Sequence, residues 1–183
     1  MHQLKNFLLL VAACLMSLAA CGAEDFSREK GYVDFGNLTG VYGKPRVQIN
    51  LGTAMLAFVS AAAEDEDKEV ADLLSKLKQI RVLVYDIANN LDDALSAVDK
   101  VTADIEKAGW ETIVSVDEDR EKARIYMKMS GNVIDGLVVM AVDESGFEGD
   151  EAEAVFINII GALDPKQVGR VMNSLDIDVD ITP

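Results

Sequence analysis

The residues of this chain with the most reactive side chains lie close to its amino terminus. They are His2, Cys14 and Cys21, the one histidine and the two cysteines among 183 residues. A thiolate can form a disulfide, bind a metal or attack an electrophile, and an imidazole is the usual base beside it. Because neither residue type occurs after position 21, the later chain lacks the side chains for Ser-His-Asp or Cys-His catalysis and for zinc sites built from imidazole or thiolate.

The elements around these cysteines indicate a targeting segment. Lys5 precedes the apolar run FLLLVAACLMSLAA at residues 7–20. That run is shorter than the about 20 residues that a membrane-spanning helix needs, and it has the length of the apolar region of a secretory signal. We therefore expect residues 1–20 to be a signal peptide.

The end of the run resembles the lipobox of bacterial lipoproteins, since it reads Leu18-Ala19-Ala20-Cys21-Gly22. In that family the cysteine thiol is alkylated by diacylglycerol, the signal is cut before the cysteine, and the new amino group is acylated with a fatty acid such as palmitate. The resemblance implies lipidation at Cys21 and a membrane anchor. In lipoproteins an aspartate after the cysteine favours retention at the inner membrane, so Gly22 favours the periplasmic side of the outer membrane.

Two other interpretations of the cysteines are weaker. A disulfide between Cys14 and Cys21 would join residues at or within the segment that is removed. Val11-Ala12-Ala13-Cys14 also fits a lipobox loosely, but it leaves too short an apolar run before it. We therefore expect lipidation at Cys21.

Composition indicates a folded domain with an acidic surface. Half of the residues are hydrophobic and the formal net charge is −15. Of the 17 lysines and arginines only Lys5 precedes Cys21, so 16 remain against 32 acidic residues. Such a charge repels phosphate backbones, so we expect no nucleic-acid partner, and its ordinary role is solubility.

The chain after the signal divides into a polar tether at 21–31 and a single domain at 32–183. Residues 32–45, which are rich in glycine, predict a loop or a short edge strand. Apolar patterns predict helices at 53–63, where the helix is expected to be buried, from 64 to about 77, at 90–108, and from Asp164 onward. They predict strands at 46–51, 79–87, 110–116, 123–129, 136–142 and 154–160. This order is typical of an α+β two-layer sandwich, an antiparallel-rich sheet with helices packed on one face.

Several of these segments resemble the DUF4252 family of bacterial lipoproteins, whose function is uncharacterised. The resemblance covers roughly residues 45 to 175 and lies in IRVLVYDI, the GW after the long helix, IYMK, GLVVMAVDES and VFINIIGALDP. The family has no established catalytic or binding residues to carry over. Its members are sometimes encoded near extracytoplasmic-function sigma factors, and this association implies a link to envelope signalling.

Basic and aromatic side chains on two predicted strands suggest a partner surface. If the helices cover the other face, Arg81, Tyr85, Arg124, Tyr126 and Lys128 could share the open one. On an acidic protein such a group would suit an anionic protein or peptide of the envelope. The alternative is a merely solvated sheet face, because the register between strands is not known from the sequence.

The acidic residues offer weaker chemistry. They cluster in turns and at helix starts, where solvated faces are expected, and the loop from Asp143 to Glu153 could hold a hard cation only loosely. Asp176-Ile177-Asp178-Val179-Asp180 lacks the glycine and glutamate of a calcium loop. We therefore predict no catalytic residue, no metal site and no cofactor, and a non-enzymatic binding or sensing module. The alternatives are a carboxylate- or cation-dependent periplasmic hydrolase and, less favoured, a calcium-buffering protein.

Overall fold

The structure, a computed structural model, describes residues 24–36, 38–87, 91–118, 121–144 and 152–167. The predicted signal peptide, Cys21 and the chain from residue 168 onward lie outside the described residues. The helices are α2 (Leu38–Tyr42), α3 (Thr53–Ala63), α4 (Lys68–Ser75) and α5 (Leu91–Lys107). The strands are β1 (Val47–Leu51), β2 (Leu77–Asp86), β3 (Glu111–Asp117), β4 (Glu121–Ser130), β5 (Val133–Asp143) and β6 (Glu153–Leu163).

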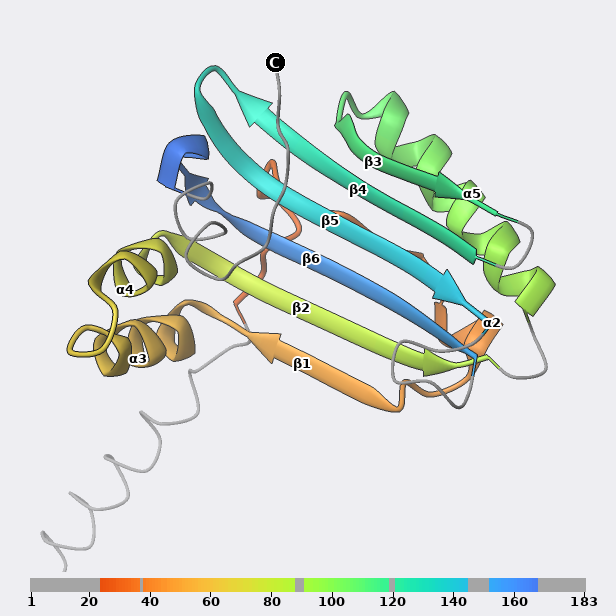
Figure 1. Ribbon diagram of the computed structural model, residues 1–183, viewed down its shortest axis with the longest axis horizontal. Coiled ribbons are helices and arrows are strands. Elements are labelled where there is room, and N and C mark those ends of the chain that lie inside the picture. The colour runs from red at the N-terminus through yellow and green to blue at the C-terminus, as the bar shows by residue number, and fades with distance from the viewer. Residues whose placement is uncertain (1–23, 37, 88–90, 119–120, 145–151, 168–183) are drawn as a thin grey trace, which may run out of the picture.

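The strands form a six-stranded sheet in the order β1-β2-β6-β5-β4-β3, and each neighbouring pair is antiparallel. Helix α5 lies behind the sheet in Figure 1, α2 lies near its right-hand end, and α3 and α4 lie at its left-hand end. The predicted α+β sandwich, an antiparallel sheet with helices on one face, is confirmed. Each predicted strand is present within a few residues of its predicted bounds.

The main core lies between the sheet and α5. Four residues of α5 point into it at helical spacing: Ala94, Val98, Val101 and Ile105. Gly109, with a φ of 72°, follows the helix as predicted, because a left-handed residue after a helix favours glycine. Phe35, Tyr42, Tyr85 and Phe156 form an aromatic cluster whose ring centroids lie 5.0–6.1 Å apart.

The segment before β1 is packed against the sheet and is not only the predicted loop or edge strand. Its apolar residues Val33, Phe35, Leu38 and Tyr42 are buried, and the last two belong to the short helix α2. The buried side chain of Asn158 on β6 holds this segment. Its Oδ1 accepts a hydrogen bond from the nitrogen of Val33 at 3.1 Å, and its Nδ2 donates to the carbonyl oxygens of Gly31 at 2.9 Å and Leu137 at 3.2 Å.

The same segment crosses β5 where two glycines meet. A Cβ built on Gly31 would lie 1.9 Å from the carbonyl oxygen of Asp135, and one built on Gly136 would lie 2.5 Å from the Cα of Gly31. Backbone atoms cannot move far enough to admit a Cβ at such distances, so this crossing requires glycine on both segments. Within the predicted tether at 21–31, residues Glu24, Glu29, Lys30 and Gly31 contact the rest of the domain.

The opposite face of the sheet is also apolar. The strand register places Val82, Ile157 and Val139 in one row across β2, β6 and β5, and each of them is half-buried. None of the described helices lies over the middle of this face, which is turned to the viewer in Figure 1.

A second apolar cluster closes the end of the sheet beside α3 and α4. Leu56 of α3 packs there with Leu77, Ile134 and Leu163. Helix α4 begins at Lys68, later than predicted, because the Asp67 side chain accepts hydrogen bonds from the nitrogens of Glu69 and Val70 and so acts as the N-cap.

Candidate functional site

The five residues predicted to form a partner surface share one face of the sheet, but it is the covered face. The strand register places Arg81 and Tyr126 in one row across the sheet. Within this row Arg81 pairs with Asn158, Asn158 with Val138, and Val138 with Tyr126. Tyr85 and Tyr126 are 2% and 0% exposed, and Arg124 is 8% exposed. The expectation that these residues jointly present an open surface is therefore wrong. Helix α5 and the segment that contains α2 lie on the side where solvent was expected.

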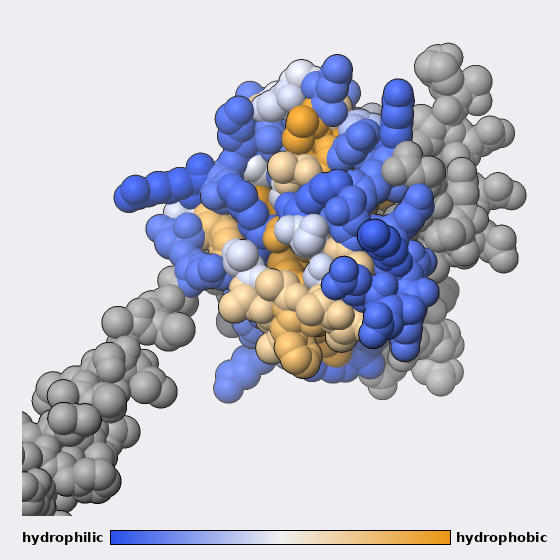
Figure 2. Space-filling view, turned by 90° about the vertical axis from the view of Figure 1, so that its left-hand side faces the viewer, coloured by the Kyte–Doolittle hydropathy of each residue, from blue (hydrophilic) through white to orange (hydrophobic). Residues whose placement is uncertain are grey.

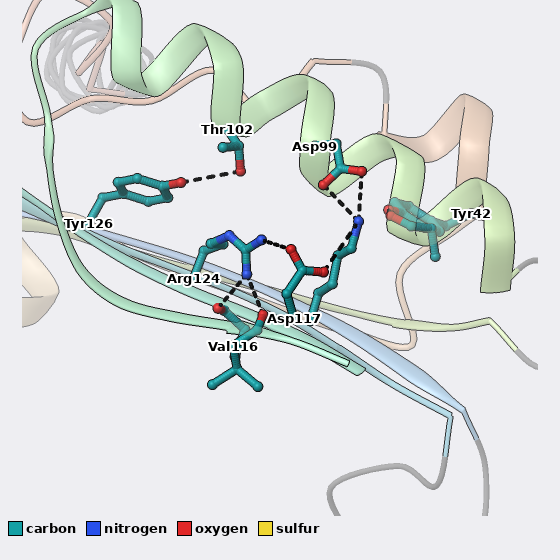
Figure 3. Close-up of polar contacts among 10 residues, drawn as sticks. Tyr42, Asp99, Thr102, Val116, Asp117, Arg124 and Tyr126 are labelled. Atoms are coloured by element: carbon teal, nitrogen blue, oxygen red, sulfur yellow. Dashed lines mark hydrogen bonds and ion pairs between the residues drawn. The ribbon is translucent and has the colours of Figure 1, made fainter. Parts of the chain in front are cut away.

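Arg124 and Tyr126 help to hold α5 and β3 onto the sheet (Figure 3). The Nη2 of Arg124 lies 2.7 Å from the Oδ2 of Asp117 on β3, and its Nη1 donates to the backbone oxygens of Val116 and Ala123. The hydroxyl of Tyr126 is 3.3 Å from the Oγ1 of Thr102 on α5. These contacts satisfy polar groups inside the fold, as buried groups require.

Lys128 and Tyr85 also have partners within the fold. The ammonium group of Lys128 donates to the carbonyl oxygens of Ala108 and Gly109 at the carboxyl end of α5, where a positive charge is stabilising. Tyr85 packs against Tyr42, whose hydroxyl donates to the carbonyl oxygen of Ala94 at 3.1 Å. Burial raises the pKa of Tyr42 well above its ordinary value, and the neighbouring Tyr85 and Asp93 raise it further.

Arg81 differs from the other four predicted residues. Its guanidinium carbon lies 5.2 Å from the ring centroid of Tyr32 and 4.9 Å from that of Phe35, and its Nη2 donates to the carbonyl oxygen of Val33. Its Nε is buried without a hydrogen-bond partner, and no carboxylate among the described residues forms an ion pair with it. Within the described fold, Arg81 therefore has aromatic and backbone partners but no ion-pair partner.

Arg81 lines a pocket of about 240 Å³ between the segment before β1 and the strands β1 and β2. Polar groups of Asp34 and Gln48 and apolar groups of Phe35 and Leu83 share this lining. A second pocket, of about 270 Å³, lies between the same segment and α5, with Lys100 and Asp104 at its wall. We call the first of these the Arg81 pocket.

Helix α3 provides a surface of a different kind. The sequence predicts a buried helix, but of its eleven residues only Leu56 is buried. Phe58 is 70% exposed, Met55 50% and Val59 37%, and Figure 2 shows apolar side chains gathered over this end of the molecule. Spacing alone could not find this surface, because a helix that is apolar on all sides carries no signal of which side the fold covers.

The first described residue lies against this helix. The Oε2 of Glu24 accepts a hydrogen bond from the nitrogen of Thr53 at 2.9 Å, and its carboxylate oxygen and the ring of Phe26 crowd Gly52, the N-cap of α3. None of the helices that the structure describes is long and apolar enough to cross a membrane.

The acidic residues are dispersed where the structure describes them. Asp99 and Asp117 form ion pairs with Lys122, and the buried Glu153 pairs with Arg46. Within the described ranges no three histidine, cysteine, aspartate or glutamate residues gather as a metal site would require. Residues 145–151 of the loop proposed as a weak cation site, and the aspartates at 176–180, lie outside those ranges.

Comparison with known proteins gives a family match. The model of a domain family described as a domain of unknown function, DUF4252, matches residues 42–171. Comparison with curated proteins and with solved structures found no match.

Proposed function

This chain belongs to the DUF4252 family, whose description assigns no activity, and from its own residues we propose that it is a lipid-anchored binding module of the bacterial envelope. In this proposal Cys21 carries the lipid, and the domain faces the periplasm from the outer membrane. The module is not an enzyme: it binds a partner of the envelope and signals or scaffolds through that contact.

The lipid anchor is supported by the apolar run at 7–20 and by Leu18-Ala19-Ala20-Cys21-Gly22. Glu24 is the first described residue and already contacts α3, so residues 21–23 are the whole of the intervening chain. The domain would therefore be held close to the bilayer.

The binding role rests on one observation, the charge of Arg81 in its pocket. A guanidinium group stays protonated and offers five N–H donors, which suit a carboxylate or another planar anion. The rings of Tyr32 and Phe35 fix its position, and Nε has no partner inside the described fold. We therefore propose that the Arg81 pocket recognises an anionic group of an envelope protein or peptide.

The anchor is tested by metabolic labelling with an alkyne fatty acid. The natural chain should take up the label and fractionate with the membrane, and Cys21→Ser should lose the label. Continued labelling of Cys21→Ser would refute the anchor.

The pocket is tested by photo-crosslinking in intact cells. A photoreactive amino acid at Gln48, which is exposed and lines the pocket, should capture a partner. Capture should be lost in an Arg81→Gln background that keeps a native circular dichroism spectrum. The same probe at Thr112, exposed on β3 at the far edge of the sheet, is the matched control. Capture that does not depend on Arg81, or no capture at Gln48, would contradict the binding site.

A further inference from the structure

We propose that the exposed apolar face of α3 lies in the surface of the membrane, beside the lipidated cysteine. This inference rests on the proposed lipid anchor and adds to it a fixed orientation of the domain. It assigns a lipid surface as the partner of the α3 face, which we define as Met55, Phe58, Val59 and Ala62.

The α3 face has the spacing and composition of a surface that requires a cover. Met55, Phe58, Val59 and Ala62 follow one another at i, i+3, i+4 and i+7, so they form one stripe along the helix. The opposite stripe is the one that contacts the domain, through Leu56 and through Ser60, whose hydroxyl donates to the carbonyl oxygen of Ala71 at 2.7 Å. A helix that is apolar all round is normally buried on both sides, in a protein core or in lipid.

The position of the chain before Glu24 identifies the cover. Residues 21–23 span at most about 10 Å when extended, since each residue adds about 3.5 Å. Helix α3 has eleven residues and is therefore about 16 Å long, and its first turn is bonded to Glu24. A lipid at Cys21 therefore brings α3 to the bilayer surface.

The charges near α3 favour a neutral lipid surface. Glu64, Asp65 and Glu66 follow the helix directly and are exposed, and the helix itself has no basic residue. A basic stripe, which would draw a helix to anionic lipids, is absent from α3. Contact with zwitterionic lipids is thus expected to be closer than contact with anionic lipids, and added salt should reduce the difference.

This orientation would place the Arg81 pocket beside the membrane-facing helix. Strand β1 ends at Leu51, just before α3, and begins at Val47, next to the pocket residues Pro45 and Gln48. Arg81 itself pairs with Asn50, next to Leu51, so the pocket residues Arg81 and Gln48 lie within about 15 Å of the start of α3. A partner of the pocket would therefore be bound close to the bilayer surface.

A thiol introduced at position 58 tests the contact. Once Cys21 is acylated and the signal is removed, the chain has no other thiol, so Phe58→Cys gives a single labelling site. Phe58 is 70% exposed, so its replacement leaves the core intact. The matched control is Lys44→Cys, at an exposed position in the loop before β1. Both full chains, purified in their acylated form, are reconstituted into phosphatidylcholine vesicles.

The expected result is protection by lipid at position 58 alone. A water-soluble maleimide should react with the thiol of Phe58→Cys about tenfold more slowly than with that of Lys44→Cys, because only the former lies in the headgroup region. A fluorescent dye attached at position 58 should be quenched by nitroxide-labelled lipids, and the same dye at position 44 should not. Vesicles with phosphatidylglycerol should give weaker quenching at low salt.

Each contrary result has a separate meaning. Acyl labelling of the same samples reports on the anchor, and its failure would end both proposals. Equal maleimide rates at the two positions in acylated protein would overturn the membrane contact and leave the anchor in place. Protection at position 58 without quenching by nitroxide lipids would show that protein covers α3, either a second copy or another part of this chain, and would also overturn the membrane contact.

Discussion

The carboxylate of Glu24 accepts a hydrogen bond from the backbone nitrogen of Thr53 at 2.9 Å, and this contact joins the start of the described chain to the start of α3. The N-cap residue of α3 is Gly52, which has no side chain to satisfy the first amides of the helix. Glu24 therefore supplies from a distant part of the sequence the acceptor that an N-cap side chain would otherwise provide.

Replacement of Glu24 by alanine should destabilise α3 without unfolding the domain. The loss of an N-terminal acceptor costs about 1 kcal/mol in the free energy of unfolding. Urea denaturation followed by circular dichroism measures this loss in the free energy of unfolding. Glu24→Gln keeps an oxygen acceptor but loses the favourable charge at the helix N-terminus, so its loss should be smaller. Equal losses in the two variants would show that the charge, and not the hydrogen bond, carries the effect.

Asn158 should be the most sensitive polar residue of the sheet. Its side chain is 0% exposed and makes three hydrogen bonds to backbone groups of Gly31, Val33 and Leu137. Asn158→Ala leaves these groups without that partner, and each buried polar group left unpaired costs about 1–3 kcal/mol. The free energy of unfolding from urea denaturation should fall by at least that amount.

The same variant should loosen the segment before β1. Trypsin under native conditions should then cut faster at Arg28 and Lys30, which are exposed and precede Gly31. Asn132→Ala, in the exposed turn between β4 and β5, is the control and should change neither the stability nor the rate of cleavage. Unchanged cleavage in Asn158→Ala would mean that the other contacts of the segment, such as the packing of Val33 and Phe35 and the bond from Arg81 to Val33, are enough to hold it.

Much of the fold could be predicted from local patterns. The apolar stripe of α5 is long and repeats with the helical period. The apolar runs of β5 and β6 have the length of buried strands, so the type and approximate bounds of all three elements follow from the sequence. The short helix α2 could not be predicted in this way. Its five residues are too few to show a period, and its Tyr42 is buried against Tyr85, Phe156 and Ala94, which lie far away in the chain.

The candidate surfaces could be predicted only in part. The alternation in β4 correctly separates Arg124 and Tyr126 from Ile125, but alternation does not say which side the helices cover. Tyr126 is buried because its ring is apolar and its hydroxyl meets Thr102, and Arg124 because Asp117 of the next strand offsets its charge. Both partners depend on strand register and helix position, which a single sequence does not contain. For the same reason the sequence wrongly predicts that α3 is buried.

Arg124 should therefore matter for stability and not for a partner. Its side chain is 9% exposed, and its guanidinium donates to two backbone oxygens as well as to Asp117. Arg124→Ala should lower the free energy of unfolding by about 1–3 kcal/mol, since buried acceptors lose their donor. Arg124→Lys should lose less, and Lys44→Ala, at an exposed site, should change little. A urea midpoint that is the same for Arg124→Ala and the natural chain would contradict this structural role.

The contact between α4 and Gln167, which follows β6, should weaken in acid. Asp72 accepts hydrogen bonds from Lys76 at 2.9 Å and from Gln167 at 2.9 Å, and Lys76 in turn donates to Gln167 at 2.6 Å. The donor Lys76, and after it Gln167, lower the pKa of Asp72 below its usual value of 3.8. The carboxylate of Asp72 thus binds a proton less readily in the folded protein than in the unfolded chain. Its contribution to the free energy of unfolding is therefore complete above the usual carboxyl pKa, and it is lost as the pH falls through the lower pKa of the folded state.

Comparison with Asp72→Asn isolates this effect, because the other carboxylates titrate alike in both proteins. The natural chain should have the higher urea midpoint at neutral pH, and the difference should shrink as the pH falls below the usual carboxyl pKa. In a Lys76→Met background, which removes the main donor, the difference should depend much less on pH. A difference between the natural chain and Asp72→Asn that stays constant down to acid pH would show that the charge on Asp72 does not stabilise this contact.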